Sequence, residues 1–142
     1  MTAYDPNNIF AKILRGELPA HRVYEDDRAL AFLDIMPRAT GHTLVIPKNP
    51  ARNNLDIDAD DLGYVAGIAQ RIARAGMKAF AADGITVQQF NETAGGQVVF
   101  HLHIHVIPRH DGVALRPPAT YKASQDELAA SAEKIRDALK NL

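Results

Sequence analysis

The apolar residues of this chain recur with two kinds of spacing, which mark out helices and strands. Spacings of three and four residues, as at Val65, Ala69 and Ile72, are typical of the buried face of a helix. Short apolar runs rich in β-branched side chains are typical of strands. We therefore expect helices at 9–15, at 59–82 and from 125 onward, and strands at 21–25, 29–34, 43–46, 85–90 and 98–107.

Residues at the ends of these segments indicate where each helix begins and stops. Gly16 stops the first helix. Asp58 is the expected N-cap of the long helix, and Asp61 gives it an imperfect capping box. Ser124 and Glu127 form the capping box of the last helix. The helix faces that we expect to be buried consist of Ile9, Phe10 and Ile13, of Leu62, Val65, Ala69, Ile72, Met77 and Phe80, and of Leu128, Ala132, Ile135, Leu139 and Leu142.

The order of the elements predicts one folding unit. A chain of 142 residues suits one domain with a single core, and it contains no repeat, low-complexity tract or linker. We predict a single α+β domain over residues 1–142, with a mainly antiparallel five-stranded sheet, a long central helix and a C-terminal helix. The tail at 109–142 comprises an irregular segment, 109–121, and that last helix.

Composition narrows the classes of function. With 46% hydrophobic and 23% charged residues, the chain is ordinary for a soluble globular protein. Its net charge of −1 gives no electrostatic basis for binding duplex nucleic acid or an anionic membrane, although a small anion can still bind a locally positive site. The absence of cysteine excludes disulfides and cysteine-based zinc sites. Without a signal-like start or an apolar run of membrane-spanning length, we expect a cytoplasmic protein.

The candidate chemistry lies in three histidines that alternate with apolar residues. His101, His103 and His105 fall within the strand expected at 98–107. Alternate side chains of a strand share a face and lie about 6.5–7 Å apart. Three imidazoles are therefore expected on one face, with the residues between them in a core. Imidazole can act as a nucleophile, a proton carrier or a metal ligand near neutral pH.

Three interpretations of this row stay open from the residues alone. A His-x-His pair with a third ligand suits zinc or copper, but no carboxylate stands beside it in the strand. Three buried, hydrogen-bonded rings would need many polar partners. One imidazole could instead be a nucleophile that the others orient. Gly95, Gly96 and Gln97 favour this third interpretation, because glycines let backbone N–H groups approach a phosphate, whose phosphorus imidazole attacks readily.

A family resemblance is carried by residues 95–109, which have the sequence GGQVVFHLHIHVIPR. This stretch resembles the signature of the histidine triad (HIT) superfamily, His-φ-His-φ-His-φ-φ, with φ apolar. Residues 9–13 are similar to the family's N-terminal helix, residues 31–34 to its ribose-contacting strand, and residues 41–48 to the next strand. The layout is most similar to compact bacterial members related to the Hint and fragile-histidine-triad branches, and it implies the HIT fold.

The resemblance implies cleavage of a nucleotide at its α-phosphorus. In the family the middle histidine, here His103, attacks that phosphorus and forms a covalent nucleotidyl-histidine, which water then hydrolyses to the nucleoside monophosphate. His101 and His105 would hold and polarise the site, and His105 would also hydrogen-bond a phosphoryl oxygen. His42 matches a histidine that steadies the triad, with an exposed residue at a strand end as the alternative.

The resemblance also places residues around the nucleotide. Asp34 matches the acidic residue that accepts hydrogen bonds from the ribose hydroxyls, with the shaping of a loop as the alternative. Asn91 and Gln97, beside Gly96, match positions near the phosphate and leaving group, although Asn91 could equally be a turn residue. The base-binding wall corresponds to Phe10, Ile13 and Ile35. The two of these in the first helix would be core residues under almost any fold.

Two departures from the family pattern bear on the binding of a structural metal and on the catalytic rate. Some bacterial members bind a structural zinc through two cysteines, a histidine and the first triad histidine. The first three positions are here Asn8, Ala11 and Pro50, and only His101 is retained, so we expect no metal and no cofactor. The second departure is Val98, where many members carry a serine or threonine that donates to the phosphate. Losing such a donor can cost several kcal/mol in a transition state.

These residues predict a homodimeric enzyme that hydrolyses purine nucleoside phosphoramidates or related AMP conjugates through His103. A dinucleoside polyphosphate hydrolase is the nearest alternative, and Val98 leaves open a nucleotide-binding or interaction module with weak catalysis. We see no fused zinc finger of the aprataxin branch, which argues against DNA deadenylation. The helix at 59–82 is the expected dimer interface, and residues 109–121 are expected to close over the site.

Overall fold

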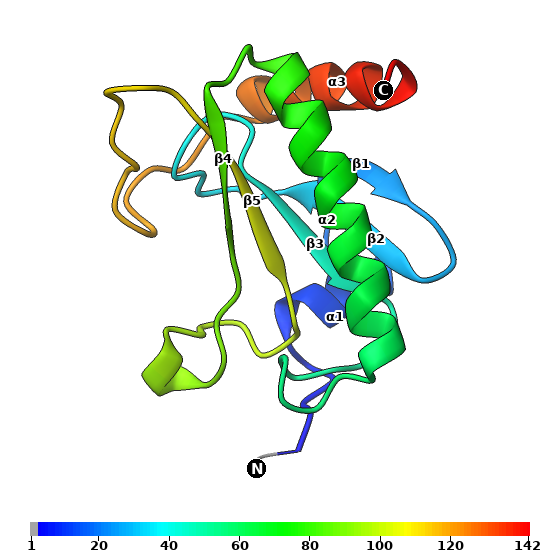
Figure 1. Ribbon diagram of the computed structural model, residues 1–142. Helices are drawn as coiled ribbons and strands as arrows, with labels where there is room; N and C mark the ends of the chain where they lie inside the picture. Colours follow the sequence, from blue (N-terminus) through cyan, green and yellow to red (C-terminus); the bar gives the residue numbers. More distant parts are fainter. Residues whose placement is uncertain (1–2) are drawn as a thin grey trace.

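A five-stranded antiparallel sheet forms the centre of the computed structural model, which describes residues 3–142 (Figure 1). The strand order is β1-β2-β3-β5-β4, so β1 and β4 are the edges. The predicted α+β class is confirmed. The strands are β1 Arg22–Glu25, β2 Ala29–Leu33, β3 Thr43–Pro47, β4 Gly84–Gln88 and β5 Ile104–Arg109. The helices are α1 Ile9–Leu14, α2 Ala59–Ala79 and α3 Gln125–Lys140, with a short 3₁₀ helix, η1, at Thr93–Gly95.

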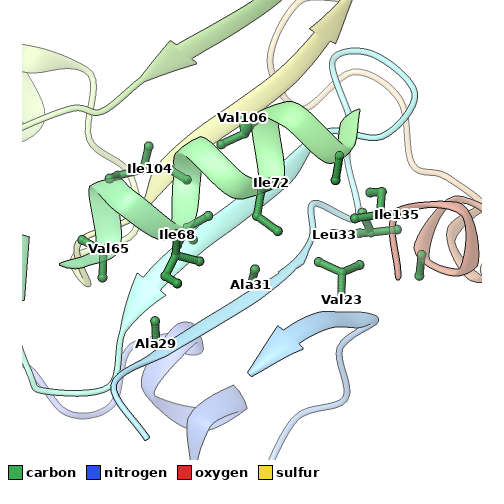
Figure 2. Close-up of a cluster of buried hydrophobic side chains, with 14 of the residues drawn as sticks. Val23, Ala29, Ala31, Leu33, Val65, Ile68, Ile72, Ile104, Val106 and Ile135 are labelled. Atoms are coloured by element: carbon green, nitrogen blue, oxygen red, sulfur yellow. The ribbon is translucent and has the colours of Figure 1, made fainter. Parts of the chain in front are cut away.

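The sheet separates two apolar clusters, one on each face. On one face α2 and α3 pack over the strands, and Figure 2 shows Ile72 of α2 above the sheet in the same cluster as Val106. On the other face the shorter α1 contributes Phe10, which packs against residues of β2 and β3. Because side chains alternate along a strand, β3 gives Val45 to the first cluster and Leu44 to the second.

Three residues that the pattern placed on buried helix faces are exposed, so these expectations were wrong. Ile9 is 49% exposed, Met77 40% and Leu142 55%. Ile9 is the first residue of α1 and Leu142 lies beyond α3, so both stand at the margin of the covered area. The buried stripe of α2 passes through Ala75 and Gly76, which turns Met77 toward solvent. The other residues of the predicted faces are buried or partly buried.

Element boundaries differ from prediction by a few residues. α2 ends at Ala79 instead of Ala82, because Ala81 adopts a left-handed φ of +47° and the N–H of Ala82 donates to the Met77 carbonyl. β4 spans Gly84–Gln88 instead of 85–90. Within residues 3–142, no helix combines the length and apolar character needed to cross a membrane.

The two capping predictions have different outcomes. Asp58 is the N-cap of α2, but its side chain makes no capping hydrogen bond, and Asp61 instead accepts from the Arg28 guanidinium at 3.0 Å. The capping box predicted for α2 was therefore wrong. Ser124 caps α3 as predicted, by accepting from the Glu127 N–H at 3.1 Å. The Glu127 carboxylate does not complete the box, since it accepts from a tyrosine hydroxyl.

The strand expected at 98–107 begins only at Ile104, so His101 and His103 precede the paired part of β5. β3 pairs with β5 as far as the Val45–Ile104 pair. Before Ile104 the segment with His101 and His103 makes no further ladder pair with β3. The N–H of Leu102 donates instead to the Ala51 carbonyl at 2.8 Å. The histidine row is therefore held partly by the sheet and partly by the segment after β3.

Replacing Ile72 by alanine tests the importance of the cluster under α2. Ile72 is 2% exposed, so Ile72→Ala should lower the free energy of unfolding by about 2–5 kcal/mol through lost burial and a residual cavity. Met77→Ala is the matched control on the same helix and should cost less than about 1 kcal/mol. Urea unfolding followed by circular dichroism measures both variants. Equal losses would contradict this assignment of the core.

Candidate active site

The three histidines gather on the α1 face of the sheet, at the start of β5. His101 is 0% exposed, His103 is 8% exposed and His105 is partly buried. The Phe10 ring stands edge-on to His103 with centroids 4.9 Å apart, and the rings of His103 and His105 are 5.0 Å apart. The residues between the histidines join the cluster under α2: Leu102, Ile104 and Val106. The predicted division into a polar and an apolar side is present, although only His105 lies in the paired strand.

The ring of His103 is held so that one nitrogen stays free. Its Nδ1 lies 2.7 Å from the carbonyl oxygen of His101. A carbonyl oxygen only accepts, so Nδ1 carries the proton and Nε2 holds the lone pair. Nε2 has no hydrogen-bond partner among the described residues, and no buried side-chain nitrogen or oxygen there lacks one, so Nε2 reaches solvent. Burial lowers the pKa of His103, which keeps the ring neutral and nucleophilic at neutral pH.

A chain of hydrogen bonds places the proton of the His105 ring on Nε2. The backbone N–H of Arg38 donates to Nδ1 of His42 at 3.1 Å, so the His42 proton is on Nε2. That nitrogen lies 2.9 Å from Nδ1 of His105 and donates to it. His105 must then carry its own proton on Nε2. Burial, with smaller contributions from neighbouring positive charge, lowers the pKa of His42 to about 4 and of His105 to about 3.

His101 is the most enclosed member of the row. Its Nε2 donates to the Pro47 carbonyl oxygen at 2.8 Å, and its Nδ1 lies 2.6 Å from the Tyr4 hydroxyl. Burial lowers its pKa to about 4. Both nitrogens of His101 are therefore engaged inside the protein, and its predicted role in supporting the site stays a prediction.

Asp34 and Ile35 follow β2 and lie beside the histidines. The Asp34 carboxylate accepts from the Met36 N–H at 2.8 Å and approaches Nε2 of His42 at 3.6 Å. Burial raises the pKa of Asp34 above its ordinary value. Ile35 is 46% exposed and available for contact with a ligand, whereas Ile13 is 7% exposed. Their assigned contacts with a nucleotide stay predictions.

The irregular segment after β5 braces the loop between Asp34 and His42. The N–H of Arg116 donates to the Arg38 carbonyl at 2.9 Å, and Nε of Arg38 donates to the Arg116 carbonyl at 2.8 Å. The N–H of Ala123 donates to the Ile35 carbonyl at 3.0 Å. These bonds fix the loop whose Arg38 N–H determines the proton position on His42. Closure of residues 109–121 over the site stays a prediction.

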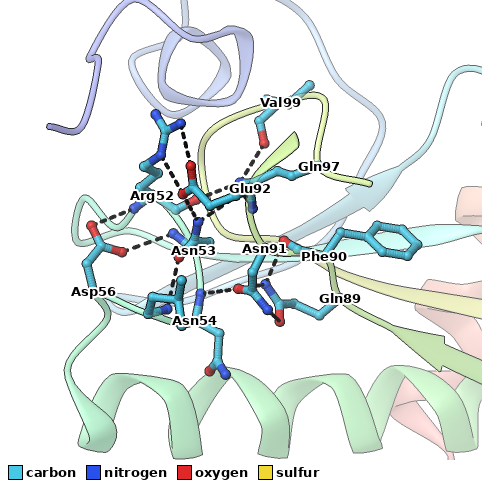
Figure 3. Close-up of polar contacts among 11 residues, drawn as sticks. Arg52, Asn53, Asn54, Asp56, Gln89, Phe90, Asn91, Glu92, Gln97 and Val99 are labelled. Atoms are coloured by element: carbon cyan, nitrogen blue, oxygen red, sulfur yellow. Dashed lines mark hydrogen bonds and ion pairs between the residues drawn. The ribbon is translucent and has the colours of Figure 1, made fainter. Parts of the chain in front are cut away.

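A buried polar network holds the loop before the histidine row (Figure 3). The Arg52 guanidinium donates twice to the Glu92 carboxylate, at 2.8 and 3.0 Å, and Asn53 adds a third donor. The amide of Gln97 is 3% exposed and donates to the carbonyls of Arg52 and Val99. Its oxygen accepts from Asn53 and from the Glu92 N–H. Gln97 therefore secures the loop in this structure, and its predicted contact with the phosphate is untested.

The other two loop residues singled out by sequence also have local roles. Asn91 accepts from the Asn54 N–H at 2.8 Å and exchanges hydrogen bonds with the Gln89 amide. Gly96 has a φ of +99°, which favours glycine, and lies against the Phe90 ring. Glu92 has a φ of +63°, a strained conformation for a residue with a side chain, and its ion pair with Arg52 holds it there.

The backbone N–H groups of the glycine loop form hydrogen bonds within the loop itself. The N–H groups of Gly95, Gly96 and Gln97 all donate within the loop, to carbonyls of residues 92 and 93. These three N–H groups are therefore engaged within the loop in this structure, and the predicted approach of the loop to a phosphate stays untested. Among the described residues, the N–H groups of Val98 and Val99 have no hydrogen-bond partner. The same holds for the N–H groups of Phe100 and His101, so several backbone donors of the segment before β5 are available to an anion.

Three residues near the triad were missed from the sequence. Tyr4 contacts His101, the Arg38 backbone orients His42, and the Phe90 ring lies 5.5 Å from His105. An aromatic residue directly before a glycine loop could have drawn attention to Phe90. Tyr4 and Arg38 gave no such signal, because their contacts depend on the folding of segments distant in sequence.

Two groups of residues have possible metal-ligand atoms within 4.8 Å of one another: Asp34, His42 and His105 beside the triad, and the surface carboxylates Asp58, Asp60 and Asp61 at the start of α2. In the hydrogen-bonded state described above, Nε2 of His42 carries a proton and offers no lone pair to a metal. At the family's zinc position, the Asn8 amide donates to the Tyr4 hydroxyl, which bonds to His101. The absence of a metal stays a prediction.

Comparison with known proteins extends the likeness beyond the histidine row. A family model of the HIT domain matches residues 15–112, more than half of the chain. A Hit-like protein from Bartonella henselae, described as involved in cell-cycle regulation and crystallised with an unknown ligand, is 55% identical, with a TM-score of 0.93 over 96% of this chain and 99% of that one.

Two further solved structures are similar over nearly their whole length. A zinc-bound histidine triad family protein from Mycobacterium smegmatis is 36% identical, with a TM-score of 0.83 over 95% of this chain and 94% of that one. A hypothetical histidine triad nucleotide-binding protein from Sulfolobus tokodaii is 33% identical, with a TM-score of 0.86 over 94% of this chain and 93% of that one. The likeness therefore includes both faces of the sheet.

The buried histidines should make the stability of the fold depend on pH. Burial holds the pKa of His105 at about 3, against 6.5 for the unperturbed side chain. The unfolded chain therefore binds a proton below pH 6.5 that the folded chain binds only near pH 3, so the free energy of unfolding falls as the pH drops through this window. His105→Asn should flatten that slope by about 1.4 kcal/mol per pH unit. Urea unfolding between about pH 7 and 4 measures the slope; an unchanged slope would contradict burial as its cause.

Proposed function

Since the chain belongs to the HIT domain family, we propose that it cleaves purine nucleotide conjugates at the α-phosphate through a covalent nucleotidyl-histidine on His103. Family membership by itself supports a nucleotide-binding hydrolase or transferase in general. One observation carries the finer proposal. Nε2 of His103 has a free lone pair, and Nε2 of the neighbouring His105 carries a proton. A nucleophile beside a hydrogen-bond donor suits attack on a phosphoryl group.

In the first step, Nε2 of His103 attacks the α-phosphorus, and a nitrogen–phosphorus bond forms. The bond from phosphorus to the leaving group breaks, and the leaving group departs with the electron pair; an amine takes up a proton from water. His105 donates from Nε2–H to a phosphoryl oxygen as negative charge develops there. The positive charge on the His103 ring is stabilised by the His101 carbonyl, which accepts from Nδ1–H.

In the second step, water attacks the phosphorus opposite to His103. A phosphorus–oxygen bond forms, the nitrogen–phosphorus bond breaks, and its electron pair returns to Nε2. The nucleoside monophosphate leaves and one proton passes to solvent. His101 and His42 do not touch the substrate in this proposal, and they act by holding His103 and His105.

Binding of the nucleotide is proposed from the family resemblance. Asp34 would accept from the ribose hydroxyls, and Phe10, Ile13 and Ile35 would line the base pocket. The position of Asp34, 3.6 Å from His42, supports a ribose site next to the reacting phosphorus. The unpaired N–H groups of Val98 and Val99 would donate to the phosphate, and Asn91, Gly96 and Gln97 would shape the loop that presents them.

Two other functions compete with this proposal. A dinucleoside polyphosphate hydrolase would use the same attack by His103 with a nucleotide as leaving group. A nucleotide-binding module with weak catalysis is favoured by one specific feature, Val98, which is 83% exposed and has no side-chain donor. No cofactor enters any of these proposals.

We further propose a homodimer that involves the outer face of α2. Three small residues on that face are exposed and would allow close approach of a second helix: Gly63, Ala66 and Gly67. The neighbouring strand β4 is an edge of the sheet, with an unpaired outer side and with Val87 56% exposed. Both features support an interface on this side of the molecule.

Removal of the proposed nucleophile is the direct test of the reaction. Incubation with an adenosine phosphoramidate and, separately, with diadenosine tetraphosphate should release AMP and give a protein mass increased by one nucleotidyl group. His103→Ala should abolish the adduct and slow AMP release by about a thousandfold or more. His110→Ala, at an exposed histidine outside the row, is the control and should keep both. Unchanged turnover in His103→Ala would refute the mechanism, whereas nucleotide binding without turnover in the unmodified protein would favour the binding module.

A serine at position 98 should restore a missing donor. Val98→Ser places a hydroxyl beside the proposed phosphate and should raise kcat by about tenfold, since one such donor can be worth 10²–10³ in favourable geometry. Val98→Ala is the matched control, because it removes bulk without adding a donor, and should leave kcat close to the original value. Equal rates in Val98→Ser and Val98→Ala would show that backbone donors already suffice.

A further inference from the structure

We propose that Tyr4 is a positioning residue, whose hydroxyl fixes the His101 ring and, through the His101 carbonyl, the nucleophile His103. The inference rests on the proposed function, since it assigns Tyr4 a role in attack by His103. Tyr4 lies outside every segment that carries the family resemblance, and its contact with His101 joins residues 97 positions apart in the chain.

The contacts form one chain that starts before α1. The Asn8 side-chain amide donates to the Tyr4 hydroxyl oxygen at 3.0 Å, and that hydroxyl lies 2.6 Å from Nδ1 of His101. On the opposite side of the ring, Nε2 of His101 lies 2.8 Å from the Pro47 carbonyl oxygen. The rings of Tyr4 and His101 also stand edge to face, with centroids 5.6 Å apart. His101 is therefore held at both nitrogens and on its ring.

The groups at the two ends of this hydrogen-bond chain determine which atom donates and which accepts in each bond. The Pro47 carbonyl can only accept, so the His101 proton is on Nε2 and the lone pair is on Nδ1. The Asn8 amide nitrogen can only donate, so the Tyr4 oxygen accepts from it and gives its own proton to His101. Replacing Tyr4 would leave a buried ring nitrogen without a partner, which is the costly case for a polar group.

Two routes connect this arrangement to the nucleophile. The His101 backbone presents the carbonyl that accepts from Nδ1–H of His103, so a shift of His101 moves the acceptor that orients the attacking ring. Asn8 is also the N-cap of α1, and its oxygen accepts from the Ala11 N–H at 2.9 Å. α1 places Phe10 against His103, so Asn8 links the hydroxyl and the helix.

The test combines ring-nitrogen NMR with kinetics. In long-range ¹H–¹⁵N spectra of the unmodified protein, we expect His101 protonated at Nε2 with a hydrogen-bonded Nδ1, and His103 protonated at Nδ1. In Tyr4→Phe, the Nδ1 signal of His101 should move to the position of an unbonded nitrogen, and the His103 Nδ1–H signal should also shift. We expect kcat for phosphoramidate hydrolysis to fall about tenfold to a hundredfold, with KM unchanged because Tyr4 does not touch substrate.

A second variant keeps the proposal testable if Tyr4→Phe folds poorly. Asn8→Asp retains the oxygen that caps α1 but replaces the amide donor by an acceptor, which competes with His101 for the Tyr4 proton. It should produce the same kind of His101 shift. Tyr24→Phe is the matched control, since it removes a hydroxyl that donates to Asp26 at 2.6 Å. This control should leave the histidine signals and kcat unchanged.

The outcomes separate this inference from the proposed reaction. Unchanged His101 signals in both Tyr4→Phe and Asn8→Asp would overturn it, as would a His101 shift with unchanged kcat and KM. If the unmodified protein forms no product while Tyr4→Phe still shifts the signals of His101 and His103, the positioning contact is supported and the proposed reaction fails.

Discussion

One hydrogen bond inside the histidine row determines what the site can do. Nδ1–H of His103 donates to the carbonyl oxygen of His101, and this leaves the lone pair of His103 on the nitrogen that reaches solvent. The bond forms where the chain has left the strand pairing, before β5 begins. Whatever holds His101 therefore also orients His103, the proposed nucleophile. Pro47 and Tyr4 do so from opposite sides of its ring.

Burying several imidazoles together is costly when any of them is charged or unpaired. Burial lowers the pKa of all four histidines of the site, so they are neutral near pH 7, and no buried side-chain nitrogen or oxygen in residues 3–142 lacks a partner. Apolar residues on the other side of the same segment offset the remaining free-energy cost of burying the imidazoles. Leu102 and Val106 are 0% and 1% exposed in the cluster under α2, so the apolar half of the alternation anchors the polar half.

The alternation of the histidine row was predictable because it depends only on backbone geometry, and the family signature identified His103 as the candidate nucleophile. Partners distant in the chain were not predictable: His42 meets His105 across 63 positions, and Tyr4 meets His101 across 97. The same limit explains the errors at element ends. β5 starts where Ile104 meets Val45 of another strand, and the free N–H groups lie after Gln97 because the loop uses the earlier ones itself.

The most direct test of the proposed site is to identify the atom that carries the nucleotide. Protein labelled with ¹⁵N-histidine would be trapped with an adenosine phosphoramidate, and ³¹P–¹⁵N coupling would locate the adduct. The hydrogen-bond pattern predicts coupling to Nε2 of His103 alone, with Nδ1 still protonated and bonded to the His101 carbonyl. Coupling to Nδ1 of His103, or to a nitrogen of His101 or His105, would contradict the proposed geometry of attack.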